Sequence, residues 1–227
     1  MADPPSIRLV TPGQNGIWRV GRADSPLSPS RITADDADHP GGNRFDVVGV
    51  GVTSFATELE GCFAETLARF RVPPGNRTLL QDDPEWRERH FMEPGSVPAD
   101  WRHRRIAVRV TLDRPYALID VDTLETHVVL DGLLASKLGE LGIDQLDVGV
   151  VRGRDRRVTR LLAAFAAAPD PSSNERFAGI RYVSRLGTWE CWAVFEWVRP
   201  VLEERLPITA DLPALQSVAK LFGLRIY

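Results

Sequence analysis

Four polar side chains stand next to apolar stretches of this 227-residue sequence: Arg19, Arg44, Glu65 and Ser184. Arginine presents a planar fork of N–H donors that suits phosphate groups, and a glutamate carboxylate stabilises a positive charge that develops beside it. Taken one at a time, each residue also has an ordinary structural explanation. Glu65 precedes Arg69 by four residues, which is the spacing and order of a helical surface ion pair. The arginines suit the surface near loops, and the serine suits a strand.

The sequence lacks the short motifs of common catalytic and metal sites. No H-E-x-x-H, G-x-S-x-G or Walker A pattern is present. The four histidines are scattered at His39, His90, His103 and His127. Their spacing is not that of metal ligands. The segment at 49–54 begins like a dinucleotide-binding fingerprint but ends on Ser54, and the arginine-rich segment 151–160 is interpreted as a solvated face.

Composition places the chain among soluble globular proteins. Hydrophobic residues make up 43% and charged residues 26% of the sequence, and the formal net charge is -3. This charge gives no reason to expect direct contact with nucleic acid. No run of about 18 apolar residues is present, so we expect a cytoplasmic protein without a membrane span. Cys62 and Cys191 lie inside apolar patterns and are predicted to be buried thiols.

The elements that must position the polar residues follow from hydrophobic periodicity. Residues 16–22 alternate and predict a strand that carries Arg19. Residues 45–55 predict a buried strand with a glycine kink. From Ala56 the period becomes helical, and Phe55 is the first residue of the apolar face of this predicted helix. Glu65 lies on the flank of that face.

The rest of the sequence mixes strands with isolated helices. Residues 104–123 predict two antiparallel strands joined at a turn over 113–115, and residues 178–197 predict two more. The tail predicts a helix over 211–223. Since the repeated strand–helix–strand alternation of a parallel sheet is missing, we expect an α+β fold with mixed antiparallel strands around a central cleft, and one domain over 1–227.

Five ordered patches link the polar residues. They are IWRVGR at 17–22, NRFD at 43–46, SFATELEGCFAETL at 54–67, GRDRRVTR at 153–160, and AGIRYVSR at 178–185 followed by CWAVF. Together and in this order they resemble the RES family, which is named for its characteristic Arg, Glu and Ser. The resemblance runs from about residue 17 to residue 197.

The resemblance implies an identity for each polar residue. The two family arginines fall on Arg19 and Arg44, the helix glutamate on Glu65 and the serine on Ser184. Phe55 stands where the family usually has a tyrosine. RES proteins are known as toxins that consume NAD+, with a fold similar to that of ADP-ribosyltransferase toxins. The resemblance therefore implies NAD+ as substrate, no metal, and an Xre-like helix-turn-helix antitoxin as partner.

These residue types suit cleavage of the nicotinamide–ribose bond. Arg19 and Arg44 would clamp the pyrophosphate, and the ring of Phe55 would pack against nicotinamide. Bond cleavage passes through an oxocarbenium-like state, which the carboxylate of Glu65 would stabilise. Ser184 would bond the ribose or orient Glu65. Nicotinamide is a good leaving group, so the reaction needs neither a metal nor an activated nucleophile.

Three functions remain open at the level of the sequence. Water or phosphate would capture the oxocarbenium in an enzyme that depletes NAD+ by hydrolysis or phosphorolysis. A protein side chain would capture it in a mono-ADP-ribosyltransferase. We favour depletion because no separate segment for recognising a target protein stands out. The third function is a non-catalytic binding module whose NAD site has decayed at Phe55.

Overall fold

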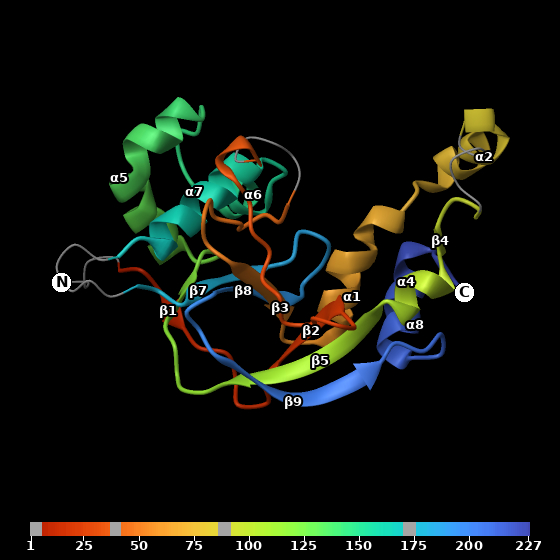
Figure 1. The fold of residues 1–227 in the computed structure, drawn as a ribbon. Helices are drawn as coiled ribbons and strands as arrows, with labels where there is room; N and C mark the ends of the chain where they lie inside the picture. Colours follow the sequence, from red (N-terminus) through yellow and green to blue (C-terminus); the bar gives the residue numbers. More distant parts are fainter. Residues whose placement is uncertain (1–5, 37–41, 86–91, 170–175) are drawn as a thin grey trace.

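The computed structural model describes residues 6–36, 42–85, 92–169 and 176–227. It shows a curled sheet with two groups of helices, α5 to α7 at one end and α1, α4 and α8 at the other (Figure 1). The sheet consists of eight strands, which are β1 (Leu9–Val10), β2 (Ile17–Arg22), β3 (Val52–Ala56), β5 (Arg105–Leu112), β6 (Leu118–Asp120), β7 (Gly179–Val183), β8 (Glu190–Phe195) and β9 (Pro200–Pro207).

The order of the strands is β1-β6-β7-β8-β3-β2-β5-β9. All neighbours pair antiparallel except β6 and β7, which are parallel. The predicted α+β class is therefore confirmed. The predicted pairing within 104–123 is wrong: β5 pairs with β2 and β9, whereas β6 pairs with β1 and β7. A short parallel pair of β4 (Ser96–Val97) and β10 (Arg225–Ile226) stands apart from the sheet.

The helices differ in length and place. They are α1 (Leu59–Leu67), α2 (Pro74–Asp82), α4 (Ala99–His103), α5 (Leu124–Glu140), α6 (Val148–Arg152), α7 (Arg156–Ala167) and α8 (Pro213–Phe222), with the 3-10 helices η1 (Ala34–Asp36) and η2 (Ala68–Phe70). The predicted tail helix corresponds to α8, which ends before Gly223 in the left-handed conformation that glycine favours. α1 packs against α8 and β2, and α7 packs against β7.

The boundary between β3 and α1 differs from the prediction. Only Val52–Ala56 of the predicted strand 45–55 is strand, and the helix begins at Leu59. Phe55 is thus a strand residue and not part of the apolar face of α1. The helix faces the main core through Phe63 and Leu67, which are fully buried.

The described residues agree with the prediction for the cysteines. Cys62 and Cys191 are free and buried. Burial raises the pKa of the Cys62 thiol to about 12, so this group remains protonated at neutral pH. His39 and His90 lie outside the described residues, and within the described part of the chain no cluster of three metal-type ligands occurs. Nor does any described helix have the length and apolar character needed to cross a bilayer.

Candidate active site

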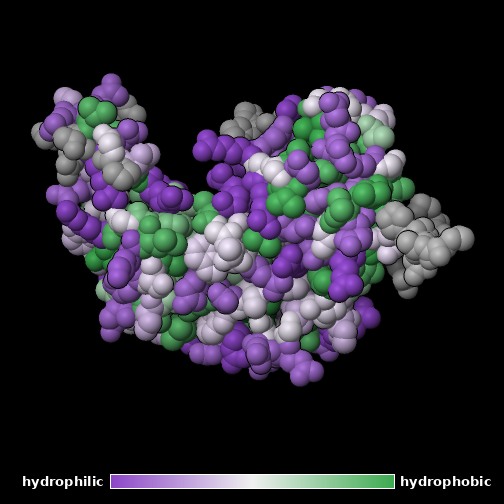
Figure 2. Space-filling view, turned by 180° about the vertical axis from the view of Figure 1, so that it is seen from behind, coloured by the Kyte–Doolittle hydropathy of each residue, from purple (hydrophilic) through white to green (hydrophobic). Residues whose placement is uncertain are grey.

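A cavity of about 590 Å3 brings together residues that are far apart in the sequence. Arg19, Arg44, Phe55 and Glu65 all line it. Figure 2 shows the surface hollowed between the lobe that carries α2 and the lobe that carries α5 to α7, with hydrophilic residues along the walls of the hollow. Ser184 is not among the lining residues but contacts Glu65 from the adjoining end of β7.

The cavity is strongly basic although the chain is net acidic. Among the residues that the structure describes, Glu65 is the only acidic one that lines it. The basic lining residues are Arg19, Arg22, Arg44, Arg69, Arg105, Arg156 and Arg185. Such a concentration of one sign of charge in a concave site attracts anions. The arrangement suits a ligand that carries phosphate or carboxylate groups.

Glu65 and Ser184 form a direct pair across the cavity wall. The Ser184 hydroxyl donates to Glu65 Oε1 at 2.5 Å, and the backbone N–H of Leu186 donates to the Ser184 oxygen at 3.1 Å. Ser184 is only 1% exposed, so its hydroxyl orients the carboxylate from behind. Glu65 itself is half-buried on α1. This contact leaves the second carboxylate oxygen, Oε2, available to face a ligand.

The alternative ion pair between Glu65 and Arg69 does not form. The guanidinium of Arg69 instead lies over the ring of Phe70, 4.7 Å from its centroid. The side chain of Arg69 is exposed. The position of Glu65 therefore follows from its contact with Ser184 and not from a surface salt bridge.

Arg44 lies in a tight turn that a buried aspartate organises. Asp46 is fully buried and accepts hydrogen bonds from the backbone N–H of Asn43 at 2.6 Å and from the Ser30 hydroxyl at 3.1 Å. The Arg44 guanidinium donates through Nη2 to the carbonyl of Val151 in α6. Because Asp46 closes the turn on one side and α6 holds the guanidinium on the other, the charge of Arg44 is kept at the cavity.

One nitrogen of Arg44 is left for a ligand. Nη1 is buried and has no hydrogen-bond partner among the residues that the structure describes. An unsatisfied buried donor costs about 1–3 kcal/mol, and more when it is charged. Burial also lowers the pKa of Arg44, an effect that nearby Tyr182 and Glu65 partly offset. A ligand oxyanion bound at Nη1 would remove the cost of the unmade hydrogen bond.

Arg19 makes more hydrogen bonds within the protein than Arg44 does. Its guanidinium donates to the carbonyls of Pro26 at 2.7 Å, Ser54 at 2.9 Å and Ser28 at 3.2 Å. These contacts use three of the five N–H groups that an arginine carries. Arg19 thus joins β2, β3 and the loop at 26–28. Its other two N–H groups make no hydrogen bond to the described residues and remain for a ligand, and the positive charge still faces the cavity.

Phe55 contributes little surface to the cavity. Its side chain is 3% exposed and belongs to a small cluster with Ile17, Val110 and Trp192. Alternation along β3 puts it on the face opposite to Ala56, which belongs to the main core. The ring is packed among core side chains, where little of it is available to stack on a ligand.

Tyr182 is a site residue that the sequence analysis missed. It lines the cavity from β7, with its ring centroid 4.5 Å from that of Phe45 and 5.9 Å from the Arg44 guanidinium. Burial raises its pKa well above the ordinary value, so the phenol is protonated and able to donate. The signal was present, because residues two apart on a strand share a face and Ser184 was already a candidate.

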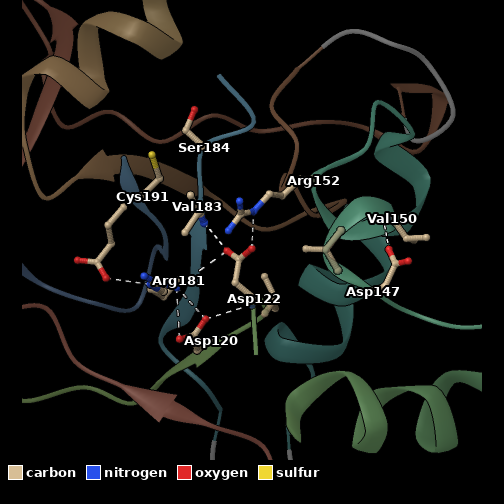
Figure 3. A network of polar contacts seen from close by, with 12 residues as sticks. Asp120, Asp122, Asp147, Val150, Arg152, Arg181, Val183, Ser184 and Cys191 are labelled. Carbon is tan, nitrogen blue, oxygen red and sulfur yellow. Dashed lines mark hydrogen bonds and ion pairs between the residues drawn. The ribbon is translucent and has the colours of Figure 1, made fainter. Parts of the chain in front are cut away.

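A partly buried ion pair joins the end of β6 to α6 (Figure 3). Asp122 follows β6 and pairs with Arg152 of α6, with 2.7 Å between Oδ1 and Nε. The backbone N–H of Val183, the residue before Ser184, donates to Oδ2 of the same carboxylate. Since Arg152 follows Val151, whose carbonyl holds Arg44, Asp122 connects the supports of Arg44 and Ser184.

A second part of this network fixes β7 against its neighbours. Arg181 donates to Asp120 at 3.1 Å and to Glu190 at 2.9 Å, and thereby bridges β6 and β8 (Figure 3). The Asp120 carboxylate also accepts from the backbone N–H of Asp122 at 3.1 Å. The strand end that carries Ser184 is therefore held on both sides by charge-assisted hydrogen bonds.

Asp122→Asn is expected to lower the free energy of unfolding by about 1.5–3 kcal/mol, the usual contribution of a hydrogen bond to a charged group. The Asp122 side chain is 4% exposed, so water does not take the place of its carboxylate, although the guanidinium of Arg152 is 35% exposed and stays partly solvated. Chemical unfolding of parent and variant measures the change. The control is Glu204→Gln, whose surface pair with Arg109 should contribute at most about 1 kcal/mol. Equal losses in the two variants would contradict a special role for Asp122.

An α+β fold with a basic cavity and an oriented glutamate suits an anionic ligand held beside one carboxylate. A family model described as the RES domain matches residues 17–215. The chain belongs to the RES-domain family. No curated protein matches its sequence.

Among solved structures, the chain is similar to one described as the crystal structure of the M. tuberculosis MbcT–MbcA toxin–antitoxin complex. The identity is 11% and the TM-score is 0.47, and the match covers 95% of this chain and 90% of that one.

Proposed function

We propose that this chain is a toxin that cleaves the nicotinamide–ribose bond of NAD+. The observation that carries the proposal is the hydrogen-bonded pair of Glu65 and Ser184 at the wall of a cavity whose other charged lining residues, within the described part of the chain, are arginines. Membership of the RES family supports NAD+ as the substrate and the cytoplasm as the place of action. The basic lining suits the pyrophosphate, and the lone carboxylate suits the ribose.

The chemistry requires one stabilised positive charge. When the bond between C1′ and nicotinamide breaks, the electron pair leaves with nicotinamide and a positive charge develops on the ribose ring. Glu65 stabilises this charge, and Ser184 holds the carboxylate in place. Arg44 and the two free N–H groups of Arg19 bind phosphate oxygens. Water then adds at C1′ and loses a proton, which gives ADP-ribose.

An assay of purified protein with NAD+ tests the proposal. We expect release of nicotinamide, measured by chromatography in phosphate-free buffer, in phosphate buffer and with added cell protein. ADP-ribose as product indicates hydrolysis, a phosphorylated ADP-ribose indicates phosphorolysis, and label on protein indicates ADP-ribosyl transfer. NAD+ binding without nicotinamide release would overturn the catalytic proposal and favour a binding module.

The partner that we propose is a helix-turn-helix antitoxin of the Xre type. An enzyme that consumes NAD+ would deplete its own cell, so a cognate protein must hold it inactive. We place the contact over the cavity between Arg44 and Glu65, because covering this opening excludes substrate. Any contact with DNA would belong to the antitoxin. Addition of the partner to the nicotinamide assay should stop the reaction.

A further inference from the structure

A second cavity, of about 690 Å3, adjoins the first. Arg22, Arg69 and Arg105 line both cavities. They come from three separate elements: the last residue of β2, the 3-10 helix η2, and the first residue of β5. The fold therefore brings three guanidinium groups together at the junction of the two cavities.

The three arginines lack ionic partners. Among the residues that the structure describes, no carboxylate forms an ion pair with any of them. Two carboxylates of the described residues line the second cavity: Asp100 pairs with Arg104 at 2.9 Å, and Asp24 accepts a hydrogen bond from the Ser25 hydroxyl at 2.9 Å. Aromatic rings orient two of the three guanidinium groups: Arg69 lies over Phe70, and Arg105 lies 4.8 Å from the ring centroid of Trp101.

The cluster is unfavourable in the absence of an anion. Arg22 and Arg105 are direct cross-strand partners in the antiparallel pair of β2 and β5. Like charges at such positions destabilise a sheet. Burial lowers the pKa of Arg105, and so do the charges of Arg69, Arg22 and Arg104, while the charge of Asp100 offsets this only in part. A bound anion would relieve this repulsion.

We infer that Arg22, Arg69 and Arg105 form a subsite for a phosphate group of the dinucleotide. The inference rests on the proposed function, since it assumes that the first cavity holds the nicotinamide ribose. Three N–H groups of Arg19 already donate to backbone carbonyls and cannot bind phosphate. The inference assigns the missing phosphate contacts to Arg22, Arg69 and Arg105. Guanidinium groups bind phosphate oxygens in bidentate fashion, and three of them match a group with several oxygens.

Two phosphate-containing groups of a pyridine dinucleotide, the pyrophosphate and a 2′-phosphate, could bind to the three arginines. The pyrophosphate is present in both NAD+ and NADP+, whereas the 2′-phosphate is present only in NADP+. Arginine is the residue that typically accommodates such a 2′-phosphate. The kinetics of the two substrates distinguish these sources, because removal of an arginine affects both dinucleotides in the first case and only NADP+ in the second.

Arg22→Gln is the most informative variant. Loss of the Arg22 guanidinium should not destabilise the fold, because the substitution removes a like charge opposite Arg105. We expect KM to rise about 10-fold with kcat changed by less than about 2-fold, the signature of lost ground-state binding. The matched control is Arg104→Gln, which lines the second cavity but is 75% exposed and paired with Asp100. Its KM should stay within about 2-fold of the parent.

A binding measurement separates this inference from the proposed function. ADP-ribose and its 2′-phosphorylated form serve as probes in calorimetry, which needs no turnover. Binding at least about 10-fold weaker in Arg22→Gln than in Arg104→Gln supports the subsite even if the parent releases no nicotinamide. Equal binding of both probes by parent, Arg22→Gln and Arg22→Gln/Arg105→Gln overturns it, even if the parent is active. Binding of inorganic phosphate alone, with both probes unaffected, also overturns the assignment to the dinucleotide.

Discussion

Glu65→Gln is expected to lower the turnover of NAD+ by about 100-fold or more, which corresponds to about 2.7 kcal/mol of transition-state stabilisation. The charge of the carboxylate matters most as the oxocarbenium forms, so KM should change little. Glutamine keeps a side-chain oxygen that accepts from the Ser184 hydroxyl, and the variant should fold like the parent. Steady-state release of nicotinamide, with thermal melting beside it, measures both expectations.

The control for this variant is Glu58→Gln. Glu58 precedes α1 directly, is exposed, and makes no side-chain hydrogen bond to the helix. It lies outside the lining of the cavity. Its turnover should match that of the parent. If Glu65→Gln also turned over NAD+ at the parental rate, Glu65 would have only a structural role beside Ser184.

The sequence predicted which polar residues meet better than it predicted how they are held. The resemblance of five ordered patches to the RES family singled out Arg44, Glu65 and Ser184, each of which taken alone had an ordinary structural explanation. The supports come from contacts across the fold, such as the bond of Arg44 to Val151 over 107 positions. No local pattern encodes a contact of this kind. Asp122 fell within the segment 104–123 that was predicted as two strands, and nothing in that pattern indicated its contacts with Arg152 of α6 and Val183 of β7.

The errors in the fold have a related cause. The turn at 113–115 suggested that the strands on either side pair with each other. The two backbone edges of β5 instead pair with β2 and β9, which are distant in the sequence. In 45–51, apolar residues surround the fully buried Asp46, whose hydrogen bonds produce a turn where hydropathy predicted a strand. Tertiary contacts decided both cases.

Phe55→Ala is expected to destabilise the protein by about 3–5 kcal/mol, the usual cost of removing a buried phenylalanine ring. The ring is 3% exposed and packs with Ile17, Val110 and Trp192, so its removal leaves a cavity between β2, β3, β5 and β8. For a chain of this size, each kcal/mol lowers Tm by roughly 2–4 °C. Thermal melting should therefore show a large decrease, and activity at high temperature should fall with it.

Two further variants decide between a core role and a stacking role for Phe55. Leu221→Ala removes an apolar side chain that is 65% exposed, and its Tm should remain near that of the parent. Phe55→Tyr places a hydroxyl among apolar side chains and should cost about 1–3 kcal/mol. Stacking on nicotinamide predicts the opposite pattern, with Phe55→Ala melting like the parent but inactive, and Phe55→Tyr equal or faster. A Phe55→Tyr protein with lowered Tm and parental kcat at low temperature would place Phe55 in the core. The phenylalanine that stands in place of the tyrosine implied by the family resemblance would then take no part in catalysis, which would rest on Glu65.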